Sequence, residues 1–368
     1  MKIPFAKPDI TKEDIQEVNN FLLNCDGQLT QGEKVEEFED RFSDYIGGGY
    51  CVATSSCMAA LHLSYLALGI GPGDEVICSA MSHVATAHAI ELVGAKPVFI
   101  DCKKDGNIDE GLLERVKKDD NIRAISLVHY LGNPCNMDYI NRIAKDFGVF
   151  GIEDCALSLG SRVDDIHTGL TGTCGAFSFY PTKHITTGEG GMFVTKDYDL
   201  YRKAKQIASF GKTSGTHADY DIGLLGSNFR MSEIQAVMGL SQLRRLTKNL
   251  EIRRRNLDIL TELSIFSHID KRVHSIFGGS YCANLRCVGR EARNNIRGKL
   301  ENKGIQTSIY YPHPIPRLSY YKNKYGYASV KYPEAIKIAD TTLALPIGPH
   351  VTEEMMNYMI KCLKEILR

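Results

Sequence analysis

The sequence predicts an α/β protein built on a mostly parallel sheet flanked by helices, with a smaller C-terminal α+β domain. Three observations lead to this class. Short apolar runs alternate with helical patterns from about residue 50, which is typical of parallel strands joined by crossover helices. The pattern becomes less regular after about residue 246. Because 368 residues are too many for one small core, one large and one smaller domain are expected.

The strands and helices of the large domain follow one another along the chain. Residues 50–56 (YCVATSS) read as a strand and a turn, and residues 57–69 carry apolar side chains at helical spacing up to Gly69. The alternation then continues with strands at 74–80, 96–102, 122–132 and 149–156, and with helices at 83–94 and 137–148.

The second half of the chain predicts the smaller domain. A long charged helix is expected at 246–264, then a more polar segment with aromatic clusters, and a closing helix at 352–367. We therefore divide the chain into a large domain, residues 26–245, and a small domain, residues 246–368, with residues 1–25 packed on the small domain.

Composition excludes several classes of function. Lys+Arg and Asp+Glu both number 44, which argues against nucleic acid as a partner. The 11 cysteines form no CxxC pair, so we expect reduced thiols and no metal site. No signal core and no run of 18 apolar residues occurs, so the sequence predicts a cytoplasmic protein with no membrane partner.

Polar side chains gather where the predicted strands end. In a parallel sheet these ends share one edge, where ligands bind. The residues concerned are Thr54, Ser55, Ser56, Ser82, His83 and Asp154.

Lys183 stands in an unusual setting, "FYPTKHITTGEGGMF". Lysine is a nucleophile only in its neutral form, which apolar surroundings favour. Aromatic residues precede Lys183, and a glycine-rich turn that allows close backbone approach follows it. A hairpin with an incidental lysine is an equally good interpretation of this stretch alone.

Asp154 ends an apolar strand, where a carboxylate is costly unless it is paired. Pyridoxal phosphate offers such a partner, because an aspartate can hold its pyridinium nitrogen protonated. A turn-capping role is the simpler alternative for Asp154 alone, but a lysine 29 residues later makes that role less attractive.

Three weaker signals accompany this pair. Residues 53–63 (ATSSCMAALHL) place hydroxyls before a helix, as in a phosphate cradle or a plain helix cap. His83 follows a strand, where it could stack on a ring or serve the fold. Asn228 and Arg230 precede a helix, in a cap, a site or a subunit contact.

With these stretches in order, the chain resembles the DegT-type sugar aminotransferases, which are fold-type-I pyridoxal phosphate enzymes acting mostly on nucleotide-linked keto-sugars. The resemblance runs nearly end to end. The matching motifs are residues 29–47, 71–77, 94–101, 152–156, 177–195, 226–243 and 345–354.

The resemblance implies roles for individual residues. Lys183 forms the Schiff base with pyridoxal 5'-phosphate and later moves the proton, Asp154 binds the pyridinium nitrogen, and His83 stacks on the ring. The cofactor's phosphate group is bound by Ser178, by the backbone N–H groups of Cys57 and Met58, and by Ser56. Asn228 reaches the cofactor of the partner subunit, which implies a homodimer with shared active sites.

Departures from the family pattern fall around the acceptor site. Cys57-Met58 stands where Gly-Thr is common, and Leu157 where Gln or Glu is common. Residues 310–318 (YYPHPIPRL) place Pro316 where a His is usual and add Arg317. The substrate residues implied here are Tyr311, His313 and Arg317.

The resemblance implies an aminotransferase that moves an amino group from L-glutamate to a nucleotide-linked keto-sugar, for surface-polysaccharide or natural-product sugar synthesis. Three alternatives stay open. The acceptor could be a smaller keto-phosphate. The enzyme could be a sugar dehydratase, whose branch carries His at the lysine position, and His184 lies next door. A cofactor-binding regulatory or structural protein is the third.

Overall fold

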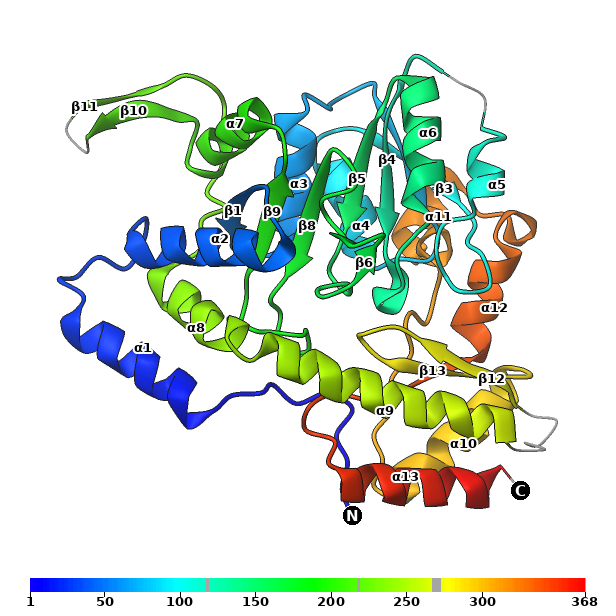
Figure 1. The fold of residues 1–368 in the computed structure, drawn as a ribbon. Helices are drawn as coiled ribbons and strands as arrows, with labels where there is room; N and C mark the ends of the chain where they lie inside the picture. Colours follow the sequence, from blue (N-terminus) through cyan, green and yellow to red (C-terminus); the bar gives the residue numbers. More distant parts are fainter. Residues whose placement is uncertain (117–118, 217–218, 267–272, 368) are drawn as a thin grey trace.

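The computed structural model describes residues 1–116, 119–216, 219–266 and 273–367. Its centre is a seven-stranded sheet of order β1-β9-β8-β5-β4-β2-β3 (Figure 1). These strands are β1 (Tyr50–Thr54), β2 (Glu75–Ser79), β3 (Lys96–Ile100), β4 (Ile122–Val128), β5 (Phe150–Asp154), β8 (Cys174–Ser178) and β9 (Gly191–Thr195).

The sheet is parallel except at one strand. β3, β2, β4, β5 and β8 pair in parallel, whereas β9 runs antiparallel to both β8 and β1. The predicted α/β class with a mostly parallel sheet is therefore confirmed. β1 consequently points the same way as β8, so that both strands end at the same edge of the sheet.

Helices cover both faces of this sheet, because successive strand residues point to opposite sides. Val76 shares an apolar cluster with residues of α3, α4 and α7, and its neighbour Ile77 shares another cluster with residues of α5 and α6. α2 lies over β1 and β8, where Phe38 and Phe42 meet the ring of Phe179. These helices are α2 (Glu33–Ile46), α3 (Cys57–Ala67), α4 (Val84–Leu92), α5 (Glu110–Leu113), α6 (Met137–Phe147) and α7 (Tyr198–Ala208).

A second sheet organises the C-terminal part of the chain. β12 (Val273–Gly278), β13 (Ala283–Cys287) and β14 (Thr342–Leu345) pair antiparallel. Leu285, Leu300 and Met359 share an apolar cluster there with Ile3, from the start of the chain. The helices beside this sheet are α9 (Leu246–Phe266), α10 (Arg290–Asn302) and α13 (Glu353–Ile366). The domain division at residues 245 and 246 stays a prediction.

α1 (Lys12–Asn24) lies along α8 (Glu233–Leu243) (Figure 1). Asp14 anchors it, accepting from Arg245 Nη2 at 2.7 Å and from Gln242 Nε2 at 3.1 Å. Burial raises the pKa of Asp14, but the hydrogen bonds from Arg245, Ser241 and Thr11, together with the charge of Arg245, outweigh it and bring the pKa to about 2. Ile3 thus packs with the second sheet, whereas α1 packs on α8.

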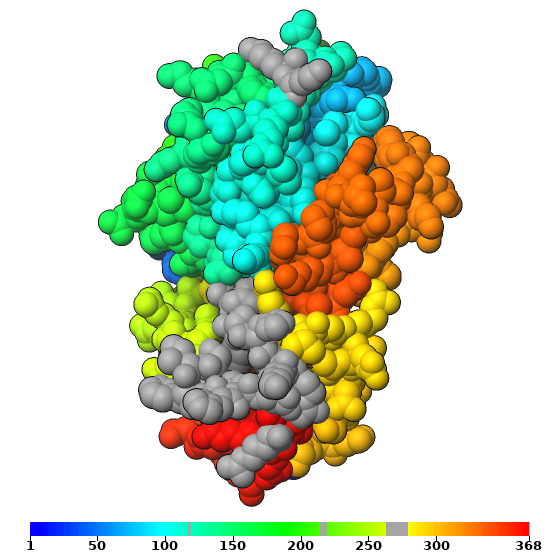
Figure 2. Space-filling view, turned by 90° about the vertical axis from the view of Figure 1, so that its right-hand side faces the viewer, coloured from blue at the N-terminus to red at the C-terminus, as the bar shows by residue number. Residues whose placement is uncertain are grey.

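Two helices of the C-terminal part return to the large sheet. Figure 2 shows this orange segment, α11 (Ser319–Tyr325) and α12 (Pro333–Thr341), against the blue and cyan part of the molecule. Tyr321 packs in the cluster beneath α3 and α4. Asp101 accepts hydrogen bonds from the first amides of α12, Glu334 N and Ala335 N. Aromatic residues of the 310–325 segment are thereby brought near the ends of β2 and β3.

The remaining strands form two hairpins, β6–β7 (Arg162–Val163 and Ile166–His167) and β10–β11 (Lys212–Thr216 and Asp219–Ile222). All 11 cysteines have free thiols, and all but Cys25 are buried. Among the described residues, no helix combines the length and apolar character needed to span a membrane.

Candidate active site

The predicted site residues meet at one edge of the large sheet. β1, β5 and β8 end there with Thr54, Asp154 and Ser178, and the antiparallel β9 begins there with Gly191. Gly191 pairs with both Thr54 and Ser178. This is the edge at which ligands of open α/β sheets bind.

A backbone cradle lies at this edge. A Cβ atom on Gly191 would lie only 2.4 Å from the carbonyl carbon of Ser56 and 2.5 Å from Cys57 N, so the start of α3 packs directly on the glycine. Ser56 Oγ accepts from Ala59 N at 3.0 Å. The N–H groups of Cys57 and Met58 have no partner within the helix and stay available to an anion.

Asp154 is 3% exposed. Its Oδ2 accepts from Thr86 Oγ1 at 2.7 Å and its Oδ1 accepts from Ala156 N at 3.1 Å. Ser82 Oγ lies 2.7 Å from Thr86 Oγ1; because Thr86 donates to Asp154, Ser82 donates to Thr86. Each carboxylate oxygen therefore has a lone pair left for a further donor. Thr86 was not among the predicted residues, although a hydroxyl one turn into a helix after a strand end is a usable signal.

Lys183 lies in the loop between β8 and β9 and is half-buried. Its Nζ lies 5.1 Å from the ring centre of Tyr281. Tyr281 OH lies 3.0 Å from Thr182 Oγ1 and 2.9 Å from Tyr310 OH. The hairpin interpretation of this stretch was correct locally, but the lysine points at an aromatic wall. Sequence reasoning missed Tyr281, which lies 98 residues further along the chain.

The neighbouring His184 faces another way. It is buried, and its Nε2 lies 3.2 Å from Ser280 Oγ. Burial first, and then the charges of Arg253 and Lys183, hold the pKa of His184 well below its usual value. His184 is therefore buried and engaged with Ser280, whereas Lys183 is half-buried.

His83 and Tyr311 lie together beside this edge, with ring centres 5.7 Å apart. His83 caps α4, since its Nδ1 accepts from Ala85 N at 3.2 Å. Desolvation of its ring lowers the pKa of His83 more than the charge of Asp154 raises it. A neutral, flat imidazole results, which suits the predicted stacking role.

Two further predicted cofactor residues, Ser178 and Asn228, take different positions. Ser178 Oγ, on the cradle, accepts from Tyr180 N at 3.4 Å. Asn228 is exposed, in a segment that pairs with Ser209. Its predicted contact with a partner subunit stays a prediction.

Arg317 is already engaged within the chain. Its Nη1 and Nη2 lie 3.0 and 2.9 Å from Asp340 Oδ1, and its Nε donates to His313 Nδ1 at 2.9 Å. Burial alone would raise the pKa of Asp340, and the bonds from Arg317 and Arg290 lower it. The substrate roles predicted for His313 and Arg317 stay predictions, and they require this pairing to loosen.

A buried pair supports β5 from behind. Glu153 points to the face opposite Asp154, as alternation requires. It accepts from His129 Nε2 at 2.9 Å and from the amides of Gly169, Thr171 and Gly172. His129, Glu153 and Cys155 place possible metal ligands within 4.8 Å of one another. Because His129 Nδ1 accepts from Cys135 N, the lone pairs of this histidine and carboxylate are already used by the protein.

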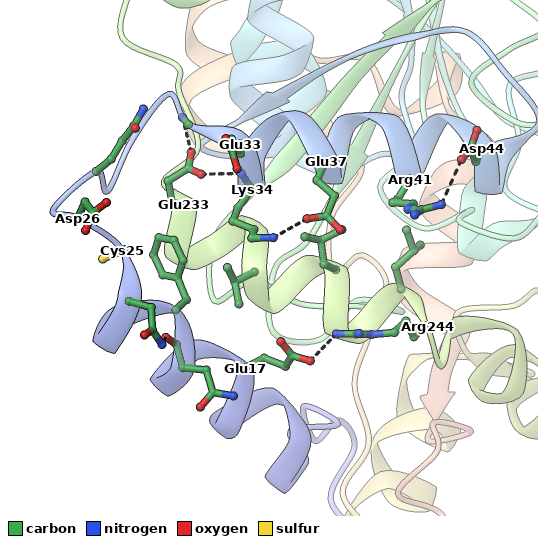
Figure 3. Close-up of a pocket in the computed structure, with 18 of the residues that line it drawn as sticks. Glu17, Cys25, Asp26, Glu33, Lys34, Glu37, Arg41, Asp44, Glu233 and Arg244 are labelled. Carbon is green, nitrogen blue, oxygen red and sulfur yellow. Dashed lines mark hydrogen bonds and ion pairs between the residues drawn. The ribbon is translucent and has the colours of Figure 1, made fainter.

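A groove of about 1090 Å³ lies elsewhere, between α1, α2 and α8. Figure 3 shows that its rim charges pair with one another, as Lys34 with Glu37 and Arg244 with Glu17. None of the predicted site residues lines it. The predicted site residues therefore lie outside this groove.

The residues at the sheet edge fit pyridoxal phosphate. The group needs an amine for its aldehyde, a carboxylate for its ring nitrogen and amide donors for its phosphate. Lys183, the buried Asp154 and the start of α3 against Gly191 supply these three. This fold and donor set define a pyridoxal-phosphate-dependent aminotransferase.

The chain belongs to the DegT/DnrJ/EryC1/StrS aminotransferase family, whose profile matches residues 8–364. A spore coat polysaccharide biosynthesis protein of Bacillus subtilis is 33% identical over 100% of this chain and 97% of its own. A GDP-perosamine synthase of Escherichia coli is 31% identical over 99% and 98%. A putative sugar aminotransferase from Streptococcus pneumoniae, solved in its PLP form, superposes with a TM-score of 0.91 at 30% identity over 100% and 98% of the two chains.

The family resemblance, the fold, the cofactor class and the enzyme class predicted from the sequence are therefore confirmed. The activity supported at this level is that of a sugar aminotransferase.

Proposed function

We propose that this enzyme transfers the amino group of L-glutamate to a keto group on a nucleotide-linked sugar, in the synthesis of a surface polysaccharide or a natural-product sugar. The observation that carries the proposal is that Lys183, in the loop after β8, and the buried Asp154, at the end of β5, belong to the same edge of the sheet. The name of the perosamine synthase relative, which specifies a GDP-linked sugar, supports the nucleotide linkage.

The chain's own residues have distinct tasks in this reaction. Pyridoxal phosphate, when bound, supplies a ring that withdraws electrons from the carbon that loses its proton. The Lys183 amine would take that proton from the donor's α-carbon and return it at the cofactor's aldehyde carbon, on the other side of the transferred nitrogen, so it has to reach both carbons. Thr86 fixes the direction of the Asp154 carboxylate, and the start of α3 with Ser178 anchors the phosphate end. Tyr281 and Tyr311 line the surroundings and exclude water.

A nitrogen-tracing experiment tests this function. L-Glutamate labelled with ¹⁵N, added alone to the purified holoenzyme, is expected to release one equivalent of 2-oxoglutarate per active site and no ammonia. A keto-sugar nucleotide added next should acquire the label and keep all its hydroxyls. Labelled ammonia together with a deoxy product would show a dehydratase instead. The orientation of His184 toward Ser280 argues against that alternative.

The acceptor class is tested by presenting the same keto-sugar in two forms, as a nucleoside diphosphate sugar and as a simple sugar phosphate. The proposal expects the nucleotide-linked form to be aminated at the higher kcat/KM. A preference for the simple phosphate would assign the enzyme to the smaller keto-phosphate alternative. Turnover of neither form, with glutamate consumption intact, would refute a sugar acceptor of this kind.

We further propose a homodimer. The β10–β11 hairpin stands away from the body of the molecule (Figure 1). Tyr220 is 51% exposed and Leu225, just after the hairpin, is 93% exposed. An exposed apolar arm beside Asn228 suits a contact with a second copy.

Light scattering tests the dimer. Leu225→Asp is expected to reduce the measured mass to the 41.0 kDa of one chain, because a buried charge opposes association. The control is Val330→Asp, which replaces a residue that is 85% exposed, just before α12, and this variant should stay dimeric. A monomeric wild-type protein would contradict the proposal.

A further inference from the structure

A small cavity next to the Lys183 loop is lined by cations and by no acid. Its volume is about 20 Å³, and its polar and charged lining comes from Lys7, Thr182, Arg253, Tyr281 and His350. By the same measure one water needs about 10–15 Å³. The cavity therefore accommodates a group of the size of a carboxylate, and a diphosphate would be too large for it.

Arg253, on α9, is the buried cation of this cavity. It is 7% exposed. Its Nη1 donates to the carbonyl of Tyr281 at 2.9 Å, whereas no described residue accepts from its Nε. Asp9, whose charge reaches Arg253 through space, is hydrogen-bonded to Asn249 and Arg245 and does not line the cavity. A buried guanidinium without a carboxylate is costly, so an anion bound in the cavity would stabilise Arg253.

His350 stands on the opposite wall of the cavity. Its Nε2 lies 3.0 Å from the carbonyl of Pro4 and therefore carries the ring proton, so its Nδ1, which has no described partner, is an acceptor, and the donors for an anion come from Arg253. Gly348 keeps this wall clear. A Cβ atom there would lie 2.8 Å from His350 Nδ1 and 3.6 Å from Arg253 Nη2.

Tyr281 connects the cavity to the reacting amine. Its ring faces Lys183 Nζ, and its carbonyl accepts from Arg253. Tyr281 thus contacts both Arg253 and the Lys183 amine. In glutamate the α-carboxylate is one bond from the carbon that loses its proton, whereas the side-chain carboxylate is three bonds away. The longer separation, that of the side-chain carboxylate, suits a carboxylate site in the cavity, across Tyr281 from the Lys183 amine.

We propose that this cavity is a subsite for the side-chain carboxylate of a dicarboxylic amino donor, with Arg253 as its ligand. This rests on the proposed function, because it assigns the amino donor of that reaction. The planar guanidinium offers paired donors to a carboxylate. A free phosphate shares the same oxyanion chemistry, and the experiment has to separate the two sources.

Binding of glutarate tests the subsite without turnover. Glutarate has the two carboxylates and no amine. By calorimetry on the holoenzyme it should bind wild type, and Arg253→Gln should weaken it at least about tenfold, the loss expected for one charge-assisted bond. Gly348→Ala, which fills the wall and keeps the charge, should do the same. The control Arg293→Gln removes another buried arginine, one bonded to the carbonyls of Ala339 and Thr342, and should bind as wild type does.

Half-reaction kinetics supply the second readout. Arg253→Gln should raise the KM for L-glutamate at least about tenfold and leave the KM for L-alanine unchanged, because alanine lacks the side-chain carboxylate. Equal glutarate binding by wild type and Arg253→Gln would overturn the subsite. Tighter binding of inorganic phosphate than of glutarate by the wild-type holoenzyme would overturn it too. If Arg253→Gln fails to fold, Gly348→Ala and the exposed Lys7→Gln decide the matter. Glutarate binding with no amino transfer from glutamate would count against the proposed function and not against the subsite.

Discussion

Replacing Lys183 with alanine is expected to abolish amino transfer while the protein still folds and binds its cofactor. Alanine has no amine to hold the cofactor or to move a proton between two carbons, and a missing proton carrier of this kind costs about 10²–10⁴ in rate on its own. His184 cannot take over the task, because its ring is buried against Tyr281 and bonded to Ser280. Cofactor binding should persist through Asp154 and the start of α3.

Two measurements check this expectation. Borohydride added to the wild-type holoenzyme should fix the cofactor irreversibly, and peptide mapping should recover it on the peptide that contains Lys183. The alanine variant should give no fixed cofactor. Lys196→Ala, which removes an exposed lysine just after the far end of β9, is the control and should behave as wild type. Recovery of cofactor on any other lysine would refute the assignment of Lys183.

The alternating part of the chain was predictable because local rules determine it. Between residues 50 and 156, strands and helices each occupy one short run with its own period, and a stop residue follows most of them. The helix that begins at Cys57 and the strand that ends at Asp154 lie where the sequence predicts them. Because parallel strands end at one edge, the gathering of Asp154, Ser178 and the start of α3 followed from the fold class.

Contacts between distant segments were not predictable. Tyr281 and Arg253 come from the C-terminal part of the chain, and no spacing in the sequence relates either to Lys183. Their positions depend on how β13 and α9 pack against the Lys183 loop. The partner of Arg317 was not predictable either. A basic residue beside prolines suggests a contact with a substrate anion, but Asp340 from α12 already pairs with Arg317.

The degree of burial of Lys183 could not be predicted from the sequence either. Aromatic neighbours in the sequence suggest an enclosed lysine, and yet Lys183 is half-buried while Tyr180 is exposed. In a connecting loop, adjacent residues turn to different sides, so apolar neighbours along the chain do not measure enclosure in space. Asp154 lies in a strand, where alternation directs each side chain, and its burial was correctly predicted.

Replacing Asp154 with asparagine is expected to lower the rate of amino transfer at least about 10²-fold with the fold intact, as for loss of one well-placed electrostatic group. The fold should survive because asparagine can satisfy both neighbours. Its Oδ1 can accept from Ala156 N, and its Nδ2 can donate to Thr86 Oγ1, which then donates to Ser82. Only the negative charge is lost, and that charge is what favours a protonated ring nitrogen in the bound cofactor.

Thr86→Val separates charge from orientation at the same carboxylate. Valine keeps the charge of Asp154 and removes the 2.7 Å hydrogen bond that directs Oδ2, so its effect on kcat should be clearly smaller than that of Asp154→Asn. The two variants should also differ in the absorbance spectrum of the bound cofactor, which responds to the charge at its ring nitrogen and should shift only in Asp154→Asn. If Asp154→Asn turned over at nearly the wild-type rate, the carboxylate would serve only to cap the turn at Ala156, and the buried charge would have no part in the chemistry.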